Sequence, residues 1–110
     1  MLLYALVSSG QLVSGTVDLR QLALKAIMVP TVVSGDLTLQ GNVDQSSGNF
    51  LRTLDFRGQG SGDLRFATGP GSRMILWPET IPTPPFARLE TLGSPQTNPA
   101  TFVLLTQPRR

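Results

Sequence analysis

Histidine and cysteine are both absent from this sequence of 110 residues. Without cysteine there is no disulfide and no thiolate metal ligand, so stability must come from packing or from association. Without histidine the chain lacks the commonest metal ligand and the commonest general base. No nucleophile with a neighbouring base is visible either, and we therefore expect no enzymatic activity.

Lysine is nearly absent. Lys25 is the only lysine, so eight of the nine cationic residues are arginines, and the net charge is only +2. Arginine is enriched at protein interfaces, whereas lysine is depleted there. A protein that binds nucleic acid normally carries a denser basic patch. The charge set therefore predicts protein partners and no nucleic acid.

Aromatic residues make up only 6% of the chain, with one tryptophan, Trp77, and one tyrosine, Tyr4. A sugar-binding β-sandwich needs exposed rings that stack on the sugar, so these two residues are its only candidates of their kinds. Trp77 follows three apolar residues and precedes a proline, which favours a position in the core or at its rim. A carbohydrate-binding adhesion module is therefore an alternative hypothesis.

The chain is long enough for one domain with a single core. Residues 1–7 form an apolar run that is too short to span a bilayer and has no basic residue before it, unlike a secretory signal. We expect no membrane partner. Residues 1–10 are predicted to form an N-terminal arm or a first strand, and residues 11–110 a β-sandwich domain.

Residues 36–56 carry the clearest local pattern. Polar and apolar residues alternate over 36–43, which predicts a strand with one buried and one wet face. Six turn-forming residues follow at 44–49, and residues 50–56 put Phe50, Leu54 and Phe56 on one face of a second strand. The pattern predicts a β-hairpin.

Residues 19–29 fit two structures. Leu22, Ala23, Ala26 and Ile27 have helical spacing, but Pro30 follows directly and residues 31–33 are β-branched. We predict a turn near Arg20 and a buried strand over 23–29, with a helix at 19–25 as the alternative.

The other segments are also typical of strands. Residues 73–77 lack alternation, which predicts burial on both faces. Residues 86–92 place Ala87 and Leu89 on one side and Arg88 and Glu90 on the other. Further strands are expected at 2–7, 63–68 and 100–106, with a proline-rich loop at 78–85. The fold class is an all-β, antiparallel β-sandwich or jelly-roll-like single domain of about eight short strands.

Motif-like stretches have structural explanations. Residues 57–62 have alternate glycines but no G-K-[S/T] ending and no following helix, which favours a loop over a phosphate site. Residues 44–49 have too few carboxylates for a calcium loop. The seven acidic residues show no spacing that selects a catalytic pair. We expect no catalytic, metal-binding or cofactor-binding residue.

Three stretches, read in order, resemble small structural proteins of tailed bacteriophages, of the capsid cement (decoration) type. They are S-G-T-V-D-L at 14–19, A-I-M-V-P at 26–30 and L-T-L-Q-G-N-V-D at 37–44, followed by F-A-R-L at 86–89 and an apolar strand at 101–105. The chain departs from this pattern at Asn42, where the pattern usually has serine.

This resemblance implies a structural virion protein on the outer capsid surface. Such proteins stabilise the head by bridging major capsid protein subunits, often as homotrimers. A tail or baseplate protein is a further alternative. The apolar first strand and the single tryptophan suggest the residues that contact a neighbouring subunit or the capsid, with the first strand docking by strand addition. These residues are Leu2, Leu3, Tyr4, Leu6, Val7 and Trp77.

Overall fold

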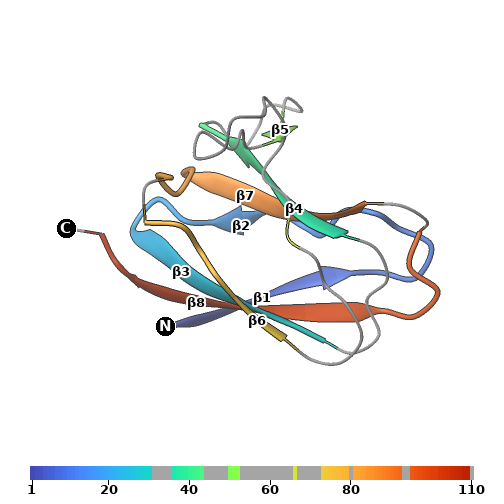
Figure 1. Ribbon diagram of the computed structural model, residues 1–110. Helices are drawn as coiled ribbons and strands as arrows, with labels where there is room; N and C mark the ends of the chain where they lie inside the picture. The colour runs from blue at the N-terminus through green and yellow to red at the C-terminus, as the bar shows by residue number, and fades with distance from the viewer. Residues whose placement is uncertain are drawn as a thin grey trace, which may run out of the picture.

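The computed structural model describes residues 1–30, 36–43, 50–52, 66, 73–79, 81–92 and 95–109. They form two antiparallel four-stranded sheets that pack on one another as a β-sandwich (Figure 1). The predicted all-β class is confirmed. The strands are β1 (Leu2–Val7), β2 (Val17–Asp18), β3 (Leu22–Val29), β4 (Asp36–Asn42), β5 (Leu51–Arg52), β6 (Arg73–Leu76), β7 (Phe86–Leu92) and β8 (Ala100–Pro108).

The first sheet has the order β1-β8-β3-β6. The long strand β8 lies at its centre, with Ala5 opposite Phe102 on one side and Ile27 opposite Leu104 on the other. β3 is the strand that the sequence predicted over 23–29, and residues 20 and 21 form the predicted turn. Pro30 ends this strand, because its ring removes the donor that the ladder would need.

An irregularity in β3 keeps its apolar residues in register with the core. The pairing with β8 shifts between Leu24 and Ala26. One extra residue at a β-bulge reverses the alternation of the side chains. Leu24 and Ile27 therefore both point into the core, although they are three residues apart.

The second sheet has the order β2-β7-β4-β5. β4 and β5 pair as the predicted hairpin, with Gln40 opposite Arg52. β7 follows the predicted alternation, since Ala87 and Leu89 belong to the core while Arg88 and Glu90 lie on the other side.

The core lies between the two sheets. Its members come from both sheets and from the loop after β6, and the largest fully buried side chain is that of Phe102. Figure 1 shows the two termini at the same end of the sandwich. The Met1 amino nitrogen donates a hydrogen bond to the Thr106 carbonyl oxygen at 3.0 Å, which ties the first residue to β8.

Two sequence-based expectations need correction. β6 is not buried on both faces, because Met74 and Leu76 are exposed. The polar side of β4 is not uniformly wet, since Thr38 is fully buried opposite Glu90. Between residues 11 and 19 the only strand is β2, and Val13 makes an isolated bridge to Glu90.

Several predicted features fall on residues that the structure does not describe. They are the turn at 44–49, residues 53–56 of the predicted second hairpin strand with Leu54 and Phe56, the glycine-rich loop at 57–62 and the strand at 63–68 apart from Phe66. In the part of the chain that is described, no helix is long and apolar enough to cross a membrane.

Candidate protein-binding face

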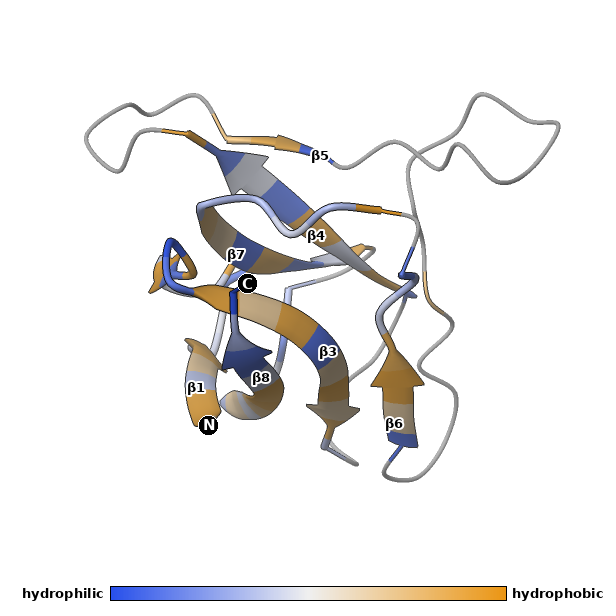
Figure 2. Cartoon of the chain, turned by 90° about the vertical axis from the view of Figure 1, so that its left-hand side faces the viewer, coloured by the Kyte–Doolittle hydropathy of each residue, from blue (hydrophilic) through white to orange (hydrophobic). Residues whose placement is uncertain are grey.

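The side of the β1-β8-β3-β6 sheet that points away from the core is apolar. We call it the outer face. In an antiparallel sandwich this side is normally polar, because it meets water. Here the strand residues that alternate with the core residues are themselves hydrophobic, and Figure 2 shows β1 and β6 in mostly hydrophobic colours. The outer face carries Leu2, Tyr4, Leu6, Met28, Met74, Leu76, Val103 and Leu105.

The registers of the three strand pairs align these residues in rows across the sheet. Tyr4 of β1 lies opposite Val103 of β8, which lies opposite Met28 of β3, which in turn lies opposite Met74 of β6. Directly opposite residues on one face of a sheet have Cβ atoms about 5 Å apart and pack on one another. This row is therefore continuous across all four strands.

A second row runs parallel to the first. It consists of Leu2, Leu105, Ala26 and Leu76, in the same strand order. Ala26 is only 1% exposed although it is not part of the core cluster. The larger side chains around this alanine therefore cover it and close the middle of the face.

Most of these side chains are accessible. Seven of the large ones are between 39% and 72% exposed, the extremes being Leu105 and Leu76. Exposed polar residues adjoin them on the same strands, with Thr101 opposite Leu6 and Lys25 next to Ala26. An apolar centre with a polar rim is the usual composition of a protein–protein interface.

Three of the six contact residues expected from the sequence lie on the outer face: Leu2, Tyr4 and Leu6. Leu3 is half-buried and packs against the core. Val7 and Trp77 are buried and cannot meet a partner on this face. β1 is an internal strand of the domain, because it pairs with β8 in its own sheet and buries Ala5 and Val7, and docking of its other edge on a neighbour stays a prediction.

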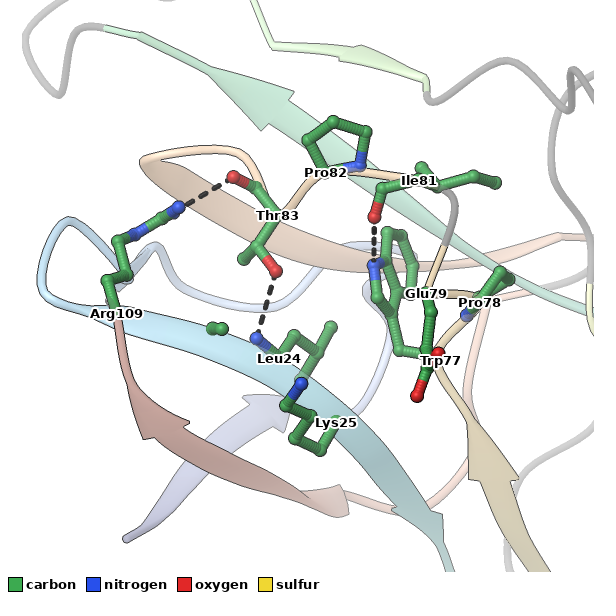
Figure 3. A pocket seen from close by; sticks show the side chains of 10 residues that line it. Leu24, Lys25, Trp77, Pro78, Glu79, Ile81, Pro82, Thr83 and Arg109 are labelled. Carbon is green, nitrogen blue, oxygen red and sulfur yellow. Dashed lines mark hydrogen bonds between the residues drawn. The ribbon is translucent and has the colours of Figure 1, made fainter.

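Trp77 belongs instead to a pocket beside the first half of β3 (Figure 3). Its indole nitrogen donates a hydrogen bond to the Ile81 carbonyl oxygen at 2.8 Å, and its ring lies 6.2 Å from that of Phe66. The pocket has a volume of about 560 Å³. Thr83 bridges its walls, since its hydroxyl accepts from the Leu24 nitrogen and its carbonyl accepts from the Arg109 guanidinium. These bonds hold the proline-rich segment against β3.

The opposite sheet has a polar outer side. Both carboxylate oxygens of Glu90 accept hydrogen bonds from Arg52, at 2.7 and 2.8 Å, and one also accepts from Gln40. The Arg52 guanidinium, which donates these bonds, lowers the pKa of Glu90 below its usual range. Arg88 bonds to Gln40 and stacks over the Phe50 ring at 4.5 Å. This side is thus satisfied by its own ion pairs and hydrogen bonds.

The sequence reasoning missed the outer-face residues of β3, β6 and β8. A signal was present, because residues 26–29, 74–77 and 102–105 are uninterrupted apolar runs. In an antiparallel sheet such a run places hydrophobic side chains on both sides of the strand.

Among the described residues, no three acidic, histidine or cysteine side chains come together in a way that could hold a metal ion. Comparison with known proteins finds no matching family model, no matching curated protein and no matching solved structure.

Proposed function

We propose that this protein is a structural component of a phage virion, of the capsid cement type, and that it docks on the outer capsid surface through its outer face. The observation that carries the proposal is the exposed apolar face itself. The sequence resemblance supplies the partner, the major capsid protein.

The size of the outer face supports a binding role. From their exposed fractions, the seven accessible residues present on the order of 700 Å² of surface, backbone and the Tyr4 hydroxyl included, which is comparable to the roughly 300–600 Å² of the largest apolar patch on a typical monomer. A standard protein interface buries about 800 Å² on each partner. The outer face alone is therefore close to the area that one specific contact requires.

The carbohydrate alternative is less well supported by the same residues. A sugar platform would need Tyr4 and Trp77 to present their rings together. Trp77 is 6% exposed and contacts Phe66, whereas Tyr4 is 65% exposed and lies among aliphatic side chains. An aliphatic surface fits a protein partner better than a hydrated sugar.

The test is binding of the purified protein to isolated phage heads that lack it, measured by co-sedimentation. We expect the wild-type protein to saturate the heads and to raise their resistance to heat. Met74→Glu and Leu76→Glu place charges within the two apolar rows of the outer face, and we expect each to weaken binding at least tenfold.

Val43→Glu is the matched control, because Val43 is also an exposed apolar residue, at 81%, but follows β4 in the other sheet. It should bind like the wild type. Equal binding by all four proteins would refute docking through the outer face. Failure of the wild type to bind heads, combined with binding to a glycan, would favour the carbohydrate alternative.

A further inference from the structure

The strand β1 has an open edge. It is the first strand in the sheet order β1-β8-β3-β6, and no strand in the described part of the chain pairs with its other side. The Met1 nitrogen donates to the Thr106 carbonyl oxygen, and the Thr106 nitrogen donates back to the Met1 oxygen at 2.9 Å. Met1 and Thr106 are therefore a hydrogen-bonded pair of the ladder.

The Met1–Thr106 pair determines which backbone N–H and C=O groups of β1 do not bond to β8. In an antiparallel ladder, hydrogen-bonded and non-hydrogen-bonded pairs alternate. Leu3, Ala5 and Val7 consequently bond to β8, whereas the N–H and C=O groups of Leu2, Tyr4 and Leu6 point to the open edge. The side chains of these same three residues are exposed on the outer face.

The sequence of β1 carries none of the features that usually protect an edge strand from pairing. Natural edge strands are shortened, charged, bulged or interrupted by proline. β1 has six residues, no charge, no proline and a regular register with β8. The edge strands of the other sheet, β2 and β5, have only two residues each, and β6 begins with Arg73.

The edge is also complementary to itself. If a second copy approaches antiparallel with a two-fold axis at Tyr4, Leu2 lies opposite Leu6 of the partner subunit and Tyr4 lies opposite the partner's Tyr4. Each of these pairs is formed by residues whose backbone groups point to the open edge, so six backbone hydrogen bonds form. Across the two-fold axis, leucine side chains contact leucine side chains and the two tyrosine side chains contact each other, and no charged residue lies between them.

We propose that two copies of this chain pair through β1 and form a dimer with one continuous eight-stranded sheet. The two outer faces then become one apolar surface. Pairing of this length, with the flanking side chains, buries on the order of 1,000 Å² in total, at the low end for a specific complex. A dimer of this interface size is expected to be reversible and concentration-dependent. The dimer needs no capsid, so it can be tested independently of the proposed function. It differs from the trimer that the sequence resemblance implies.

The first test is sedimentation equilibrium of the purified protein over a range of concentrations. We expect a monomer–dimer equilibrium for the wild type. Tyr4→Pro removes an N–H group of the open edge without breaking a bond to β8, so it should give a monomer with a nearly unchanged Tm. Ala5→Pro removes a bond to β8 and should lower the Tm strongly. Tyr4→Lys provides a second monomeric variant, since its charge would face the same charge across the axis.

Amide hydrogen exchange tests the register. At low concentration the amides of Leu3, Ala5 and Val7 should be protected, and those of Leu2, Tyr4 and Leu6 should exchange freely. At high concentration the second set should become protected as well. Cross-linking gives a further test, because the chain has no cysteine and Tyr4→Cys therefore adds a single thiol. A short thiol-reactive linker should join two copies of Tyr4→Cys. It should not join two copies of Met74→Cys, because Met74 lies on β6 at the opposite edge of the sheet.

A wild-type monomer at all concentrations would overturn the proposal. A trimer would also overturn it, as would a dimer that persists in both Tyr4→Pro and Tyr4→Lys. The proposal would also be overturned if the Tyr4 amide showed no added protection from hydrogen exchange in the associated protein.

Discussion

Two neighbouring residues of β1 test whether this strand is part of the domain core or only an arm. Val7 is fully buried among core residues, whereas Leu6 lies on the outer face and is 50% exposed. The substitutions Val7→Ala and Leu6→Ala remove similar amounts of hydrocarbon from adjacent positions. Their effects should differ because only Val7 packs in the core.

The expected difference follows from burial. Val7→Ala removes two carbon atoms, worth about 0.8 kcal/mol each in transfer free energy, and leaves a small cavity that adds to the loss. We expect the free energy of unfolding to fall by about 2 kcal/mol. For a chain of this length the entropy of unfolding converts that loss into a Tm lower by about 8 °C. Leu6→Ala should change the free energy of unfolding by less than about 0.5 kcal/mol.

The assay is urea unfolding monitored by circular dichroism, at a protein concentration low enough to keep the chain monomeric. Deletion of residues 1–7 is the stronger version of the same test. It should unfold the domain, because it removes Ala5 and Val7 from the core and leaves β8 as an unprotected edge. Equal and small effects of Val7→Ala and Leu6→Ala, or a truncated protein of normal stability, would show that β1 does not belong to the core.

Two further predictions concern the second sheet. A Cβ atom at Gly41 would lie 2.6 Å from the Cβ of Pro84, and because a proline ring cannot move aside easily, Gly41→Ala should cost about 1–3 kcal/mol in urea unfolding. Gly15→Ala is the control, because no atom lies within 4 Å of a Cβ built there, and it should change the free energy of unfolding by less than about 0.5 kcal/mol. An equally small effect of Gly41→Ala would contradict the close packing of β4 against Pro84. Glu90→Gln should cost about 1–2 kcal/mol near pH 7, because it weakens the charge-assisted bonds from Arg52. Because the folded pKa of Glu90 is lowered, its contribution is fully present above the ordinary value of 4.5 and is lost as the pH falls through the folded pKa. The stability difference between wild type and Glu90→Gln should therefore shrink in acid, and a difference that stays constant from pH 7 to pH 3 would refute this role.

Much of the fold was predictable because local patterns and the global structure agree. Alternation over β4 and β7, the proline after β3 and the turn residues between strands each specify a strand or its end. The helical spacing of residues 19–27 was overruled by tertiary pairing, since a bulge in β3 lets Leu24 and Ile27 reach the same core. Bulges of this kind depend on the partner strand, so the sequence of one strand does not reveal them.

The candidate site was only partly predictable. Leu2, Tyr4 and Leu6 could be found because they alternate within one apolar segment. Met28 and Met74 could not be joined to them from the sequence, because β1, β3 and β6 come together only through pairing over long separations. The apolar neighbours of Trp77 favoured a position in the core or at its rim, and the structure confirms it, since the ring is buried and bonds to Ile81; its place among the expected contact residues came from its being the single tryptophan.

The two sheets of this one domain provide an internal comparison that bears on function. In the second sheet, Gln40, Arg88 and Glu90 face away from the core and bond to one another, and Phe86 on the same side is covered by the Arg20 guanidinium. In the first sheet, the corresponding positions are apolar and exposed. Both sheets have to pack on the same core, so the needs of folding do not explain the difference. Exposed apolar rows lower solubility and invite aggregation, a cost that is compensated when the surface is covered by a partner. The proposed binding role of the outer face would account for this difference, and it predicts that substitutions there affect association far more than stability.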